Sequence, residues 1–153
     1  MDLTFFAIAI PVASAILGYL VGFWMQKWKA TETRRNDIEK LRRPIYAEAL
    51  DIVFNIENSR HDVEFLKSSL INLADWLPAK ANYFPPTGTD VVFGIITYGF
   101  MYSCDMHNRE TEAKLKSRFL FHDNLQKAKL FFMNNEDIRW LPEDLEQQKQ
   151  PKK

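Results

Sequence analysis

The sequence predicts an all-α protein in which an N-terminal transmembrane helix is followed by a long helix and a small antiparallel helical bundle. Three observations lead to this fold class. The chain of 153 residues begins with a long stretch that carries no charge. Apolar residues then recur with an average spacing of about 3.5, as on helices that pack against one another. Prolines and a glycine divide the remaining chain into segments whose short connections imply antiparallel neighbours.

The first element is the apolar stretch of residues 3–25, which is long enough to cross a bilayer as one helix. Basic residues follow it directly, and such residues favour the cytoplasmic side. We therefore expect a single-pass anchor over residues 1–26 in the inner membrane, with the N-terminus outside and the remaining chain in the cytoplasm. A cleaved signal peptide is the alternative, because residues 13–15 resemble a cleavage site. It is disfavoured because no basic segment precedes this site and the apolar run continues past it.

Small residues recur at every fourth position of this stretch, at Ser14, Gly18 and Gly22. They share one face of a helix and form a groove through which two helices can approach closely. The pattern predicts self-association into a homo-oligomer. The alternative is that glycines are simply common in membrane helices.

A basic segment over residues 27–43 follows the predicted anchor. The whole chain carries 20 basic and 20 acidic side chains, so the excess of basic residues in this segment is a local feature. We expect the segment to contact anionic headgroups of the bilayer. The chain beyond it has no basic stripe, which argues against a nucleic-acid-binding surface. The basic residues assigned to the lipid contact are Lys27, Lys29, Arg34, Arg35, Arg42 and Arg43.

The strongest pattern behind the basic segment is an apolar seam between residues 45 and 77. Its members alternate spacings of three and four residues, which predicts one continuous helix that presents a narrow face to a partner helix. Pro44 is expected to kink this helix at its start. A cytoplasmic bundle would thus extend over residues 44–145. The seam residues are Ile45, Ala49, Ile52, Ile56, Ser59, Val63, Leu66, Leu70, Leu73 and Leu77, of which only Ser59 is polar.

Turn signals and a second apolar segment follow the seam. Pro78 ends the long helix, and the prolines and glycine of residues 82–88 form a turn. Residues 90–104 are apolar nearly all round. A buried helix capped by Thr89 or Asp90 is preferred here to a buried strand, because a strand has no evident partner.

The C-terminal part of the bundle is predicted to contain two helices. The first covers residues 108–133, where an apolar repeat follows two polar turns. Asn135 caps a short final helix, which Pro142 ends. Residues 146–153 are expected to be a disordered tail because they are low in complexity.

No strong catalytic motif is present, so an interaction protein is favoured over an enzyme. Arg118 and His122 would share one face of a helix, where they could position a phosphate and move a proton. Alternatively, they are an exposed and a half-buried residue without a chemical role. The pair resembles the Arg/His motif of HEPN-type ribonucleases, which are also small helical bundles. That family usually has four to six residues between the two, whereas this chain has three. The resemblance implies RNA as a substrate.

Two other groupings contain residues of the kind that bind metals. Cys104 and His107 could supply two ligands, but a structural zinc ion needs four. Glu57, His61 and Glu64 lie on neighbouring helical turns, but a di-iron site needs a matching set on another helix. We therefore predict neither a metal nor a cofactor. The single cysteine cannot form an intrachain disulfide, which agrees with a reducing compartment.

The run EKLRRPIYAEAL at residues 39–50 resembles a segment of many small bacterial membrane-anchored helical proteins of unknown function, and residues 130–146 are similar to them too. This resemblance implies no activity. The predicted single N-terminal span, helical body and late Arg/His pair also resemble a membrane-anchored, HEPN-like accessory protein of RNA-targeting CRISPR systems. Tyr46 and Trp76 are predicted to pack in the core rather than to bind a ligand.

The functional expectation is a membrane-anchored adaptor or regulator that acts by self-association or by binding an unknown protein partner. The alternative is an oligomeric effector, in phage defence, that perturbs the membrane or cuts RNA with Arg118 and His122. RNA is a partner only under this second hypothesis.

Overall fold

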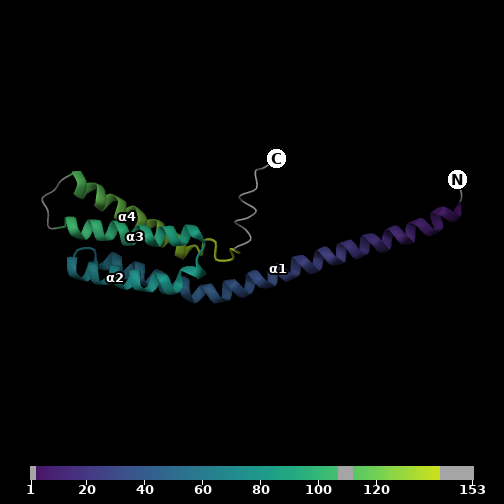
Figure 1. Ribbon diagram of the computed structural model, residues 1–153, viewed down its shortest axis with the longest axis horizontal. Helices are drawn as coiled ribbons and strands as arrows, with labels where there is room; N and C mark the ends of the chain where they lie inside the picture. Colours follow the sequence, from purple (N-terminus) through teal and green to yellow (C-terminus); the bar gives the residue numbers. More distant parts are fainter. Residues whose placement is uncertain (1–2, 107–111, 142–153) are drawn as a thin grey trace. The chain divides into compact units, whose positions relative to one another are not determined.

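The computed structural model describes residues 3–106 and 112–141, with side chains from residue 14 onward. In these residues the chain is all-helical and contains no strand, which confirms the all-α prediction. The chain divides into two compact units, Met1–Asp37 and Ile38–Lys153. The helices are α1 (Leu3–Ser59), α2 (Val63–Lys80), the 3₁₀ helix η1 (Ala81–Tyr83), α3 (Pro86–Asp105) and α4 (Glu112–Met133). Figure 1 labels the four α-helices.

The predicted transmembrane anchor is wrong. Within the described residues, no helix combines the length and the apolar character that crossing a bilayer requires. Where side chains are described, the uncharged run extends only from Ser14 to Gln26, and Lys27 follows it in the same helix α1. The predicted inner-membrane localisation, with the N-terminus outside, is overturned by the same finding. The earlier part of the predicted anchor, residues 1–13, lies outside the described side chains.

The predicted continuous helix over the seam is also wrong, because the chain reverses between Ser59 and Val63. Asp62 is the N-cap of α2, and its carboxylate accepts hydrogen bonds from the backbone N–H groups of Glu64 at 3.0 Å and Phe65 at 3.2 Å. Such a cap satisfies amide groups that have no partner within the helix. The seam is therefore divided between two neighbouring helices. Pro44, the predicted kink, lies within α1, which continues past it.

Both halves of the seam still face the core of the second unit. Val53, which the seam did not include, is fully buried, whereas Ile52 and Val63 are only half-buried. The seam residues that are buried are Ile45, Ala49, Ile56, Leu66, Leu70, Leu73 and Leu77. The apolar pattern thus identified the buried faces, although it missed the turn between them.

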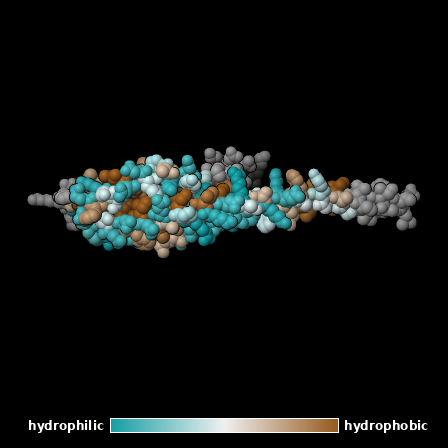
Figure 2. Space-filling model, turned by 90° about the horizontal axis from the view of Figure 1, so that it is seen from below, coloured by the Kyte–Doolittle hydropathy of each residue, from teal (hydrophilic) through white to brown (hydrophobic). Residues whose placement is uncertain are grey.

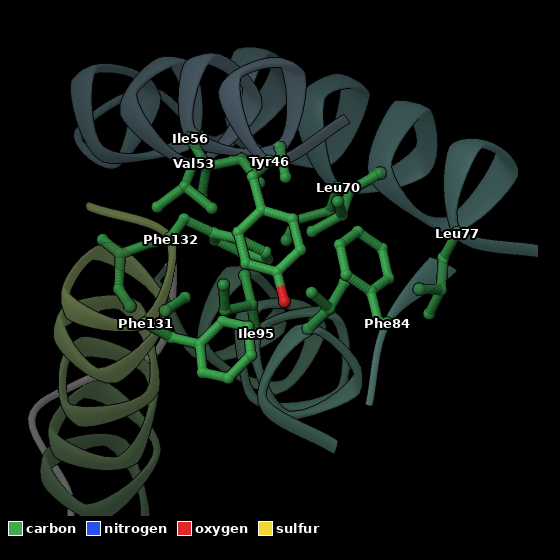
Figure 3. Packing of buried hydrophobic residues seen from close by; sticks show 14 of the residues in the cluster. Tyr46, Val53, Ile56, Leu70, Leu77, Phe84, Ile95, Phe131 and Phe132 are labelled. Atoms are coloured by element: carbon green, nitrogen blue, oxygen red, sulfur yellow. The ribbon is translucent and has the colours of Figure 1, made fainter. Parts of the chain in front are cut away.

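Aromatic rings fill the centre of the bundle around Tyr46, as Figure 3 shows. The ring of Tyr46 lies 5.6 Å from that of Phe84, 5.7 Å from that of Phe131 and 5.3 Å from that of Phe132. Trp76 also packs against Phe84, at 5.7 Å between ring centroids. The predicted packing role of Tyr46 and Trp76 is confirmed.

The apolar segment after the turn is a helix, as predicted, and not a strand. It begins with Pro86 at its first turn rather than at Thr89 or Asp90, because the fixed φ of proline suits this position and its missing N–H has no helical partner there. Glycines let α3 approach its neighbours closely. A Cβ atom on Gly99 would lie 2.6 Å from Cδ2 of Leu70 and 3.1 Å from Cε2 of Phe121.

Gly99→Leu is therefore expected to lower the free energy of unfolding by about 1–3 kcal/mol, because the added side chain has no room between Leu70 and Phe121. Thr97→Leu is the matched control, since Thr97 is exposed on the same helix. Urea denaturation followed by circular dichroism measures both variants. Equal midpoints for the two would show that α3 does not pack as tightly at Gly99 as the structure indicates.

The chain after α4 forms turns instead of the predicted final helix. Asn135 and Asp137 have φ values of 51° and 53°, in the left-handed region that asparagine and aspartate tolerate better than most residues. Ile138 and Leu141 are nevertheless buried. We call residues 134–141 the C-terminal strap. Residues 108–111 of the helix predicted at 108–133, and the predicted tail at 146–153, lie outside the described residues.

The strap is held against α1 by two side chains that come from the basic and Pro-Ile-Tyr region of the sequence. Arg42 is only 5% exposed, and its Nη1 donates hydrogen bonds to the carbonyl oxygens of Ile138 at 3.0 Å and Trp140 at 2.7 Å. The hydroxyl of Tyr46 donates to the carbonyl of Glu136 at 3.0 Å. Buried backbone carbonyls need such donors, so the two side chains fix the strap in place.

Candidate functional site

The first candidate is the small-residue face of α1 in the first unit. An added Cβ atom on Gly18 or Gly22 would meet nothing within 4 Å, so this face is open in the chain by itself. Large apolar side chains surround it and are exposed to an unusual degree, for example Leu17 at 62% and Trp24 at 69%. Figure 2 shows hydrophobic surface on this part of the chain. The exposed apolar residues are Ile16, Leu17, Tyr19, Leu20, Val21, Phe23, Trp24, Met25 and Trp28.

The basic residues of the predicted segment are divided between the two units and lie in different environments. In the first unit, Lys27, Lys29 and Arg34 are exposed and Arg35 is half-buried. The ammonium of Lys27 lies 5.8 Å from the centre of the Phe23 ring.

Arg42 and Arg43 belong to the second unit and have other roles. Arg42 holds the C-terminal strap, and its guanidinium also lies 5.5 Å from the centre of the Trp140 ring. Arg43 forms an ion pair with Glu39 at 2.6 Å on the surface. No local pattern around these two adjacent arginines predicts that they lie in such different environments.

The second candidate contains the predicted Arg118 and His122, which lie one turn apart on α4. Arg118 is exposed and His122 is half-buried, with its ring 6.2 Å from that of Tyr102 and 5.7 Å from that of Phe121. Burial lowers the pKa of His122, and the positive charges of Arg60 and Arg118 lower it further. A histidine in this environment is neutral at pH 7 and can accept or donate a proton.

Arg60 and His61 also act electrostatically on His122, a relation that the sequence analysis did not predict. They lie in the turn between α1 and α2, where Nε of Arg60 donates a hydrogen bond to Nε2 of His61 at 3.1 Å. Both residues lower the pKa of His122, whereas the carboxylate of Glu57 raises it. The single helix predicted through residue 60 could not show this relation, because it contains no reversal of the chain at that point.

A third feature is a polar surface groove of about 390 Å³ between α1 and α2. Its lining is rich in amide and hydroxyl groups and contains no ionisable side chain. It can therefore offer hydrogen bonds but no acid–base chemistry. The polar residues of the lining include Asn55, Asn58, Ser68, Ser69 and Asn72.

The groupings considered for metal binding are not assembled in the part of the chain that the structure describes, where no three His, Cys, Asp or Glu residues come together. Cys104 is exposed, and its predicted partner His107 lies outside the described residues. Glu57 forms an ion pair with Lys129 at 2.8 Å. These residues therefore offer no metal site that the structure describes.

Comparisons with family models, with curated proteins and with solved structures find no match to this chain. The resemblance to small bacterial membrane-anchored proteins and to HEPN-like proteins accordingly stays a prediction.

Proposed function

We propose that the protein acts by interaction, as a helical bundle that self-associates through the small-residue face of α1. The observation that carries this proposal is the exposure of nine large apolar side chains between Ile16 and Trp28 around a face that is open at Gly18 and Gly22. Contiguous exposed apolar surface of this extent marks interaction sites in proteins.

A second copy of the same chain is the partner that fits this face best. Without a Cβ atom at Gly18 and Gly22, two such helices can approach backbone to backbone and pack their flanking apolar side chains. A two-fold arrangement needs only one self-complementary surface. Full burial of one large apolar side chain contributes about 1.5–3 kcal/mol, so burial of several offsets an association cost of about 4–15 kcal/mol.

Gly18→Leu combined with Gly22→Leu is expected to reduce the mass of the oligomer, because the two leucines would hold the helices apart. The change should not harm the chain itself, since nothing lies within 4 Å of either new Cβ atom and leucine favours helix over glycine. Size-exclusion chromatography with light scattering on the full-length protein measures the mass.

Ala30→Leu is the control, since it enlarges an exposed small residue of the same helix outside the apolar stretch. It should leave the mass as in the unaltered protein. If the double variant keeps the same mass as the unaltered protein, or if the unaltered protein is a monomer at micromolar concentration, self-association through this face is wrong.

A further inference from the structure

We propose that the polar groove between α1 and α2 is a binding site for a neutral sugar in its ring form. The groove has a volume of about 390 Å³, within the range of about 300–1,000 Å³ that is usual for small-molecule sites. It lies in the second unit, so the proposal does not depend on self-association through the small-residue face of α1. The side chains that we assign to the sugar contact are Asn55, Asn58, Phe65, Ser68, Ser69 and Asn72.

The lining comes from one face of each of the two helices. α1 contributes two asparagines three residues apart, and α2 contributes a phenylalanine followed at three, four and seven residues by two serines and an asparagine. Intervals of three and four residues place side chains on the same face of a helix. The hydroxyl groups of Ser59 on α1 and Ser69 on α2 lie 3.4 Å apart, so a direct contact joins the two helices at the groove.

The polar side chains of the groove are largely free to bind a ligand. Among the described residues, the side chains of Asn55, Asn58, Ser68 and Asn72 form no hydrogen bond within the protein. Each asparagine offers a carbonyl acceptor and an N–H donor side by side. The neighbouring hydroxyl groups of a sugar ring both donate and accept, so they can pair with both ends of such an amide. A ligand without these groups would leave the amides unpaired, which costs binding energy.

Asparagine is a poor residue for the helices in which it stands here. It has a lower helix propensity than alanine, glutamate or lysine, because its side chain competes for backbone hydrogen bonds. Asn124 on α4 compensates by donating to the carbonyl of Leu120 at 2.8 Å. Asn55 and Asn72 have no such bond among the described residues. Residues that weaken their own helix without a compensating contact are typical of functional sites.

The groove carries no charge, although charged residues make up 26% of the chain. None of its described lining residues is ionisable. The charged residues between positions 60 and 64 do not line it, nor do Asp51, Glu57 and Lys67. An ionic ligand would therefore find no opposite charge in the groove, and a neutral polar ligand is favoured.

An exposed aromatic ring completes the site. Phe65 lines the groove, and 68% of it is exposed. The face of an aromatic ring is apolar and carries partial negative charge. One face of a sugar ring presents C–H groups, which are apolar and partially positive, so it can stack on Phe65 while the hydroxyl groups reach the amides. A neutral sugar thus matches both kinds of surface in the groove.

The test is a titration of the full-length protein with D-glucose, D-galactose, D-mannose and N-acetyl-D-glucosamine, followed by the side-chain amide signals of Asn55, Asn58 and Asn72 in NMR spectra. We expect at least one sugar to shift these signals saturably, with a Kd on the order of millimolar because a small ligand in an open groove buries little surface. Glycerol at the same concentration should not shift them. D-glucuronate should bind no more tightly than D-glucose. Absence of a saturable shift with all four sugars, an equal shift with glycerol, or tighter binding of D-glucuronate would overturn the proposal.

Asn55→Ala and Asn72→Ala should each weaken binding of that sugar by about three- to tenfold, as expected for the loss of hydrogen bonds to the ligand. Neither variant should lower the melting temperature, because alanine favours a helix more than asparagine does. Asn82→Ala is the matched control at an exposed asparagine outside the groove, and its affinity should stay within about twofold. If all three variants bind equally well, the sugar does not lie in this groove.

Phe65→Ala should weaken binding by at least about threefold, through the loss of the stacking surface. The cap of α2 remains, since Phe65 contributes only its backbone N–H to the bond with Asp62. Phe93→Ala is the matched control, because Phe93 is 61% exposed on α3 and does not line the groove. Equal effects of the two variants would contradict the assignment of Phe65 to the site.

A dilution series without sugar distinguishes a second copy of the chain as the occupant of the groove. If the three amide signals shift on dilution and no sugar shifts them, the groove is an interface between copies and the sugar site is wrong. If they stay constant on dilution and respond to a sugar, the groove is a ligand site as proposed.

Discussion

Replacing Arg42 with methionine is expected to lower the free energy of unfolding of the bundle by about 2–5 kcal/mol. Arg42 is 5% exposed, and its guanidinium is the donor for the carbonyl oxygens of Ile138 and Trp140. Methionine has a similar length but no donor, so both carbonyls would lose their partner inside the protein. The contact of the guanidinium with the Trp140 ring would also be lost.

The neighbouring Arg43 provides an unusually close control. Its side chain is 69% exposed, and its ion pair with Glu39 is one of the surface i, i+4 pairs that contribute little. Arg43→Met should therefore change the free energy of unfolding by about 0.5 kcal/mol or less. Guanidinium chloride denaturation measures both variants. Similar effects for the two would contradict the assignment of Arg42 to the strap.

Tyr46→Ala is expected to destabilise the bundle by about 3–5 kcal/mol, the range for removal of a large buried aromatic side chain. Tyr46 is 1% exposed and packs against the rings of Phe84, Phe131 and Phe132, so alanine would leave a cavity at the centre of the core. Thermal and chemical denaturation both report the loss.

Tyr46→Phe separates the hydroxyl from the ring. It keeps the aromatic packing and removes only the hydrogen bond to the carbonyl of Glu136, so a loss of about 0.5–1.5 kcal/mol is expected. Burial raises the pKa of Tyr46, so its hydroxyl stays protonated and remains a donor at neutral and mildly alkaline pH. Tyr83→Ala, at an exposed tyrosine of η1, is the control for the loss of an aromatic ring and should cost much less. Equal losses at Tyr46 and Tyr83 would contradict the central place of Tyr46.

The sequence predicted the helical class and most of the buried faces, because apolar periodicity reports burial directly. Leu66, Leu70 and Leu73 are almost completely buried, as the seam predicted. The error at the turn arose because the spacings of three and four residues continue across it. Asp62 followed by Glu64 was the available signal for a helix start, since aspartate is a preferred N-cap and acidic residues favour the first turn.

Other features depend on contacts that no local pattern contains. The burial of Arg42 is decided by the carbonyls of residues 138 and 140, which the sequence separates from it by 96 and 98 positions. Arg60 likewise lowers the pKa of His122 only because the chain reverses after Ser59. The local charge and hydropathy of the sequence predicted that Arg42 belongs to a basic surface segment. Neither quantity contains information about the distant carbonyl oxygens that Arg42 binds.

The predicted anchor shows a different limit of sequence reasoning. An uncharged run was interpreted as an independent element, whereas α1 is continuous from Leu3 to Ser59 and contributes to both compact units. Neither Pro11 nor Pro44 ends it. A proline costs a helix one backbone hydrogen bond, and a helix of this length can tolerate that loss.

The bonds from Arg42 and Tyr46 to the C-terminal strap have a consequence for a chain that is still leaving the ribosome. When the segment with Arg42 and Tyr46 emerges, the carbonyls that these side chains will bind are 90 to 98 residues away and not yet synthesised. The α1–α2 hairpin can form early because its contacts are local, but the aromatic core cannot close until the last described residues are available. Until then, Tyr46 and Arg42 of the nascent hairpin would be exposed and accessible to chaperones. The bundle would be completed only when the strap leaves the exit tunnel.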